Sequence, residues 1–175
     1  MLPPEPCKAL SRAPEGFDPI DAPELISQAK KGPGEGGVCD ARAFRVNGTP
    51  TIYRAYNGTN PSSKLGQWWA LEEPSGPVSA YRRDYQICYQ WSPLDRLVKC
   101  TLRVGAKVVL GTGQSAACSQ YLSYSTSASI QLYLADAKAD AMDCTEFDAM
   151  LSWERTETKA PRNMSTGMGT ASAAE

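Results

Sequence analysis

Thr51-Ile-Tyr-Arg-Ala-Tyr56 is the stretch of this sequence that decides the fold. β-Branched and aromatic residues alternate along it, which is typical of a strand. Comparable segments follow at residues 86–90, 98–104, 107–110 and 129–134, and glycine or proline residues separate them. Because little helix lies between these segments, we expect an α+β fold built mainly from an antiparallel, curled sheet, with a single β-rich core domain at residues 51–158.

The segments outside this core are expected to support it. Residues 1–50 are predicted to form an N-terminal arm with a proline-rich start, a short helix at 21–32 and an edge strand near 39–46. Residues 136–143 and 146–155 are predicted to be helical, with a few inward-facing apolar side chains. Residues 159–175 are small and polar, and we expect this tail to be disordered.

Charge and hydrophobicity exclude some classes of partner. The net charge is −1, so the chain has no overall basic field that would attract nucleic acid. Its apolar runs are far shorter than the roughly 20 residues that cross a bilayer, so we expect no membrane-spanning segment. The first residues lack the basic and apolar regions of a signal peptide, so a secreted form is expected to be the mature one.

Six cysteines bear on the compartment of the protein. They are widely spaced, no CxxC pair occurs, and the chain contains no histidine, so we expect no metal site. Disulfides and a secreted, extracellular protein are the favoured interpretation, and loop lengths suggest the pairs Cys7–Cys39, Cys88–Cys100 and Cys118–Cys144 among 15 possible pairings. The alternative is that several cysteines are reduced and buried.

Two polar residues inside predicted strands are candidates for binding an anionic ligand. Arg54 lies in the middle of the first core strand, where its guanidinium can present a planar fork to a phosphate or carboxylate. Gln131 lies between Ile130 and Leu132, where an amide needs a specific hydrogen-bond partner. The alternatives are that Arg54 lies on a solvated face or pairs with an acid, and that Gln131 faces solvent in an alternating strand.

Other residues are candidates for lining the same cleft. Trp68 and Trp69 are adjacent, so one of them can enter the core while the other stacks on a planar ring, although both can equally fill the core. A cationic region at residues 82–107 begins with Arg82 and Arg83. Hydroxyl groups of Ser125-Thr-Ser127 precede Gln131 closely and can face the cleft.

The order of Arg54, Gly66-Gln-Trp-Trp69, Pro74, Tyr81, Tyr85, Gly105 and Gln131 resembles that in secreted NAD glycohydrolases of the tuberculosis-necrotising-toxin type and their fungal surface relatives. The resemblance covers roughly residues 52–134. It implies an ADP-ribosyltransferase-like split β-sandwich around an NAD cleft, with NAD as substrate. The histidine of that family is absent here, and the spacing from Arg54 to Gln131 is longer than the resemblance leads us to expect.

The resemblance also implies roles for single residues. Arg54 would bind the NAD pyrophosphate, with help from Arg82 or Arg83. Trp68 or Tyr85 would bracket the nicotinamide. Gln131 would direct the ribose or the attacking water.

Two other functions fit the sequence. In a mono-ADP-ribosyltransferase toxin, Arg54 and Ser125-Thr-Ser127 would take the places of the arginine and serine-threonine-serine motifs, but no Glu-x-Glu pair follows. In a non-enzymatic, disulfide-rich binding module, the tryptophans and tyrosines would form an interface. A toxin of either enzymatic kind would act on a host target and can have an immunity protein as partner.

Overall fold

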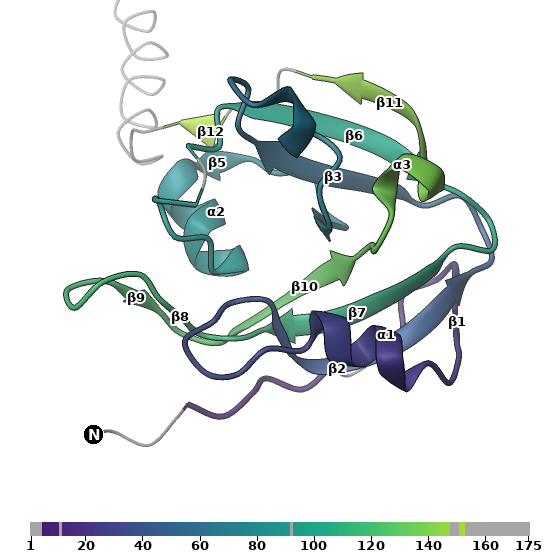
Figure 1. Ribbon diagram of the computed structural model, residues 1–175, viewed down its shortest axis with the longest axis horizontal. Coiled ribbons are helices and arrows are strands. Elements are labelled where there is room, and N and C mark those ends of the chain that lie inside the picture. Colours follow the sequence, from purple (N-terminus) through teal and green to yellow (C-terminus); the bar gives the residue numbers. More distant parts are fainter. Residues whose placement is uncertain (1–4, 11, 92, 148–150, 153–175) are drawn as a thin grey trace, which may run out of the picture.

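The computed structural model describes residues 5–10, 12–91, 93–147 and 151–152. Strands and short helices alternate along the chain (Figure 1). The elements are β1 (Phe17–Pro19), α1 (Pro23–Ala29), β2 (Val38–Val46), β3 (Thr51–Tyr56), the 3-10 helix η1 (Pro61–Ser63), β4 (Trp68–Ala70), β5 (Gly76–Pro77), α2 (Val78–Tyr85), β6 (Arg96–Leu102), β7 (Lys107–Gly113), β8 (Ala116–Ala117), β9 (Ser123–Tyr124), β10 (Ser127–Tyr133), α3 (Ala137–Asp140), β11 (Ala141–Glu146) and β12 (Leu151–Ser152).

Among the described residues, eight strands form one antiparallel sheet in the order β1-β2-β7-β10-β4-β3-β6-β11. The expected α+β class with a mainly antiparallel sheet is confirmed. β1 occupies the edge and β2 lies inside it, so the expected boundary at residue 50 falls within a continuous sheet. The predicted strand at 39–46 is therefore paired on both sides instead of lying at the edge.

The sheet curls so that its two halves share one core. Phe44 and Leu110 come from β2 and β7, whereas Ile52 and Leu102 come from β3 and β6 at the other end of the strand order, yet all four belong to one buried cluster. Figure 1 shows β2 and β7 lying opposite β3 and β6, with β10 between them. Each of these four side chains is fully buried, so this cluster is the hydrophobic centre of the fold.

Two helices pack against the sheet, one on each half. α1 covers β2 and β7, and it buries Ala29 against Val38 and Val109. α2 buries Val78 and Tyr81 in a second cluster with residues of β3 and β6, and it also contacts β10. α2 thus contacts both halves of the curled sheet. The candidate site described below lies beside this helix.

Some predicted elements differ in the structure. The helix predicted at 21–32 is α1, but residues 136–143 form only the short α3 before the chain enters β11, whose polar and apolar residues pair with β6. Residues 86–90 form no strand, because α2 ends there with Gln86 in the left-handed conformation (φ 50°). The predicted helix at 146–155 is wrong where it can be compared, because Glu146 ends β11 and Leu151–Ser152 form β12; residues 148–150, 153–155 and the whole predicted tail lie outside the described residues.

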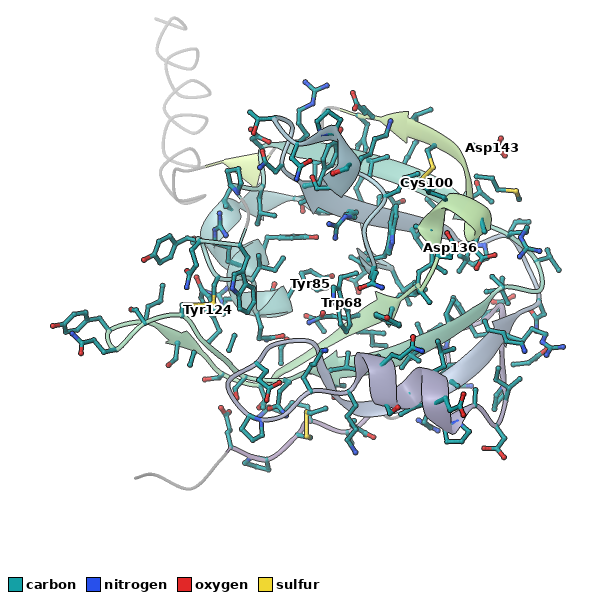
Figure 2. The ribbon with its side chains drawn as sticks, in the orientation of Figure 1. Trp68, Tyr85, Cys100, Tyr124, Asp136 and Asp143 are labelled. Carbon is teal, nitrogen blue, oxygen red and sulfur yellow. A yellow bond between two sulfur atoms is a disulfide. The ribbon has the colours of Figure 1, made fainter. Side chains whose placement is uncertain are left out.

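All six cysteines lie in the described part of the chain and form three disulfides, Cys7–Cys39, Cys88–Cys118 and Cys100–Cys144. The first pair was predicted correctly and the predicted pairs Cys88–Cys100 and Cys118–Cys144 are wrong. Cys100 lies in β6 next to β11, where a bulge with Asp143 at φ 51° brings Cys144 beside it. The yellow bond near the Cys100 label in Figure 2 marks this bridge.

These bridges are typical of proteins from oxidising compartments. Within the described ranges, no helix has the length and apolar character needed to cross a membrane.

Candidate functional site

A cavity of about 280 Å³ lies between α2, the loop after β3, β4 and β10. Arg54 and Gln131 both line it, although β4 separates their strands in the sheet. Trp68 from β4 and Tyr85 from α2 also line the cavity, and both are labelled in Figure 2. The structure therefore brings the two principal predicted residues and two predicted aromatic residues into one concave site. Its volume is near the lower end of the range for small-molecule pockets, about 300–1,000 Å³.

The Arg54 guanidinium is held by main-chain carbonyls. Its Nε donates to the carbonyl of Ser63 at 2.9 Å and its Nη1 donates to the carbonyl of Trp68 at 2.9 Å. Gly66 is close enough that an added Cβ would overlap the guanidinium, so the small residue allows this placement. The side chain is thus fixed by the loop between β3 and β4.

No ion pair in the described part of the chain includes Arg54. Burial lowers the pKa of the guanidinium, but an arginine stays charged at neutral pH. A half-buried positive charge without a carboxylate favours an anionic ligand. Within the described residues, Arg54 therefore does not form the structural ion pair with an acid that was one alternative prediction.

The orientation of the Gln131 amide follows from its neighbours. Gln131 Nε2 donates to the Tyr85 carbonyl at 3.2 Å and to Gln86 Oε1 at 3.0 Å. The Gln86 amide is fixed in turn, because its Nε2 donates to the carbonyls of Arg83 and Ser125. Main-chain carbonyls only accept hydrogen bonds, so both amides have a single consistent orientation.

These hydrogen bonds use only the nitrogen of the Gln131 amide. Gln131 is 4% exposed, and its Oε1 accepts no hydrogen bond within the described residues. Because no fully buried side-chain polar atom of these residues lacks a partner, this oxygen is not fully buried, and Gln131 is among the residues that line the cavity. The alternative that Gln131 faces bulk solvent is wrong, since α2 covers its face of the strand.

Aromatic side chains form much of the cavity wall. Trp68 packs edge-on against Tyr133, with ring centroids 5.1 Å apart. Trp69 also borders the cavity, but its ring is buried in the main core and donates from Nε1 to the Gly66 carbonyl. The pair is therefore divided between cavity and core, which is one of the two predicted arrangements.

Tyr81 and Tyr85 pack against each other on the α2 side, with ring centroids 4.8 Å apart and ring planes tilted by 42°. Burial raises the pKa of Tyr81 to about 12 and also raises that of Tyr85, so both phenols are neutral at physiological pH. Neutral aromatic rings at a cavity wall are suited to stacking on a planar ligand.

Four other predicted site residues do not line the cavity. Arg82 is buried on α2 and donates from Nη1 to the Ile87 carbonyl at 3.4 Å, while Arg83 is exposed and its Nε lies 3.8 Å from Asp84 Oδ1. Ser125 is exposed, and Ser127 Oγ accepts from the Ser129 amide. Thr126 lies between these serines, and its hydroxyl donates to the Pro6 carbonyl. This contact helps to hold the N-terminal residues against β10.

Sequence reasoning missed several lining residues. Gln86 was assigned to a strand, although its buried amide controls Gln131. Lys31, Glu35 and Trp91 also border the cavity, from a glycine-rich loop and from the loop after α2. The glycine cluster at residues 32–37 was a local signal of an unusual backbone, but no local pattern could indicate which cavity the loop borders.

The described residues contain no group of three or more histidine, cysteine, aspartate or glutamate side chains arranged to hold a metal ion. Comparisons of the chain with protein-family models, curated proteins and solved structures found no match.

Proposed function

We propose that the protein is a secreted toxin or effector that hydrolyses NAD to nicotinamide and ADP-ribose. One observation carries the proposal. Arg54, which makes no ion pair within the described residues, and Gln131, whose amide orientation is fixed by hydrogen bonds, line the same cavity together with several aromatic side chains. The curled antiparallel sheet is consistent with the split β-sandwich implied by the sequence resemblance. The three disulfides support a location outside the cell.

Arg54 would bind the phosphate adjoining the nicotinamide ribose. Its Nη2 has no hydrogen-bond partner within the described residues, while Nε and Nη1 are held by carbonyls. A preorganised guanidinium loses little conformational entropy when it binds a phosphate. Trp68, Tyr81 and Tyr85 would hold the nicotinamide ring in the aromatic part of the cavity.

Gln131 would act where positive charge develops. As the bond between ribose C1′ and the ring nitrogen breaks, its electron pair leaves with nicotinamide and the ribose becomes cationic. The Gln131 carbonyl oxygen is the negative end of a fixed dipole and can also accept a hydrogen bond from the attacking water. The water oxygen adds to C1′ and releases a proton to solvent, so no strong base is required.

Hydrolysis is favoured over transfer to a protein. Ser125, Ser127 and the nearest following acids, Asp136 and Asp140, are not among the described residues that line the cavity. These are the groups that the transferase interpretation of the sequence would use to bind the ribose and to orient an acceptor. This observation supports water as the acceptor.

Nicotinamide release from NAD, measured together with labelling of added protein, tests the proposal. Wild-type protein should release nicotinamide without labelling a partner. Arg54→Ala should lower kcat/KM about 100-fold, because it removes a charged contact to the substrate. This change corresponds to a loss of about 2.7 kcal/mol of transition-state stabilisation. Arg45→Ala, an exposed arginine on β2, is the matched control and should retain full activity.

Labelling of a partner would identify a transferase instead. Absence of both nicotinamide release and labelling would reject the enzyme and favour a binding module.

A further inference from the structure

The mouth of the cavity carries a second group of side chains, separate from Arg54 and Gln131. Lys31 and Glu35 come from the loop between α1 and β2, and Trp91 comes from the loop after α2. Trp91 is 52% exposed, in contrast to the core residue Trp69 at 2%. The mouth therefore presents one aromatic face, one cation and one carboxylate.

Trp91 is fixed although it is exposed. Its ring lies against Gly36, where an added Cβ would be 3.3 Å from the ring carbons. Its amide donates to the Cys88 carbonyl at 2.9 Å, and Cys88 is bridged to Cys118. Neighbouring Gln90 donates to the Cys118 carbonyl at 2.8 Å. An aromatic ring held in this way is a preformed stacking surface.

The loop that carries Lys31 and Glu35 is braced as well. Gln114 Nε2 donates to the Lys31 carbonyl at 3.0 Å, and the Gly36 amide donates to the Ser115 carbonyl at 2.9 Å. Neither Lys31 nor Glu35 takes part in an ion pair within the described ranges. Two fixed elements thus present unpaired charges of opposite sign beside Trp91.

We propose that this mouth is a subsite for adenosine 5′-phosphate, so that the enzyme prefers a dinucleotide to nicotinamide mononucleotide; this inference rests on the proposed function. The purine would stack on Trp91, Lys31 would bind the second phosphate, and Glu35 would accept hydrogen bonds from the ribose hydroxyls. The loop between α1 and β2, which carries Lys31 and Glu35, would then determine the preference for NAD over the mononucleotide.

The test compares NAD with nicotinamide mononucleotide, which contains the same scissile bond but lacks the adenosine phosphate. Trp91→Ala should raise KM for NAD about tenfold, because stacking of one base contributes about 1–3 kcal/mol, and should leave kcat/KM for the mononucleotide unchanged. Lys31→Ala should act in the same direction and more strongly at low salt. Tyr121→Ala, at an 89% exposed aromatic residue, and Lys30→Ala are controls that should leave KM and kcat/KM unchanged for both substrates.

A binding measurement separates this subsite from the catalytic proposal. Calorimetry with adenosine monophosphate should give a Kd about tenfold weaker for Trp91→Ala than for wild type, whether or not NAD is hydrolysed. If wild type releases no nicotinamide but shows this difference, the hydrolase proposal fails and the subsite stands. If Trp91→Ala leaves NAD kinetics unchanged, or impairs both substrates equally, the subsite is overturned and the hydrolase proposal is unaffected.

Discussion

At the scale of single residues, the key feature is the hydrogen-bonded pair of glutamines, Gln86 and Gln131, called here the glutamine relay. Gln86 is 1% exposed and Gln131 is 4% exposed, and each amide is fixed by main-chain carbonyls. Gly113 makes room for this relay, because an added Cβ there would overlap Gln86 Oε1. The sequence allowed us to select Gln131 as an awkward amide in an apolar strand, but Gln86 and Gly113 become meaningful only when β7, β10 and α2 meet.

Gly113→Ala should therefore reduce activity although Gly113 does not line the cavity. The methyl group would displace the Gln86 amide, release Gln131 and lower the free energy of unfolding by about 1–3 kcal/mol. We expect at least a tenfold loss of kcat in a nicotinamide-release assay below the melting temperature. Gly48→Ala, where an added Cβ would meet its nearest atom at 3.8 Å, is the control. Unchanged kcat in Gly113→Ala would contradict the relay.

The pH profile is a second prediction at this scale. The chain contains no histidine, and burial raises the pKa of Tyr81 to about 12, so this phenol keeps its proton throughout the neutral range. We expect kcat/KM to vary less than about threefold between pH 6 and pH 9. A bell-shaped profile centred near pH 7 would show that an unrecognised acid or base takes part.

At the scale of elements, alternation predicted the strands well and the segments around the site poorly. β3, β6, β7 and β10 lie where the sequence predicts strands. α2 was missed because its buried residues Val78 and Tyr81 and its half-buried residue Tyr85 are β-branched or aromatic, types that also occur in strands. β4, which carries Trp68 and Trp69, is only three residues long, too short for alternation to predict it as a strand.

The last strand of the sheet provides a prediction on stability. Glu146 on β11 binds Tyr56 of β3 and Arg96 of β6, and these hydrogen bonds, that of Tyr56 first, lower the pKa of Glu146 below its ordinary value of 4.5. The carboxylate form is thus favoured by folding. Its contribution is complete above pH 4.5 and disappears as the pH falls through the lower, folded pKa.

The melting temperature of wild type should therefore exceed that of Glu146→Gln at pH 7, and the difference should shrink as the pH falls below 4.5. Circular dichroism melts at several pH values measure this difference. Glu15→Gln, at an exposed glutamate, should show no such trend. A difference between wild type and Glu146→Gln that is independent of pH would mean that the three-residue contact does not stabilise the fold.

At the scale of the whole molecule, non-local contacts determine what the sequence could not predict. Loop length favoured the pair Cys88–Cys100, but β6 carries Cys100 into the sheet and leaves Cys88 beside β8. Similarly, the N-terminal segment was predicted as an arm, whereas β2 lies inside the sheet and Lys31 borders the cavity. Pairings over such separations depend on sheet order, which periodicity does not encode.

The disulfides should differ in function. Cys88–Cys118 braces the loop that carries Trp91, whereas Cys100–Cys144 joins two strands away from the cavity. Each double serine variant should lose about 2–4 kcal/mol of unfolding free energy. Only the Cys88→Ser/Cys118→Ser variant should also raise KM for NAD, measured at a temperature where both variants are folded. Equal KM values in the two variants would contradict this division.

The most direct test of the account is the rate of nicotinamide release from NAD by the disulfide-intact wild type and by Gln131→Ala. We predict that wild type turns over NAD, and that Gln131→Ala lowers kcat about 100- to 1,000-fold because a fixed dipole at the reacting ribose is lost. Gln120→Ala, at an exposed glutamine, should retain wild-type kcat. A folded Gln131→Ala variant with wild-type kcat, or a wild type that releases no nicotinamide, would contradict the account.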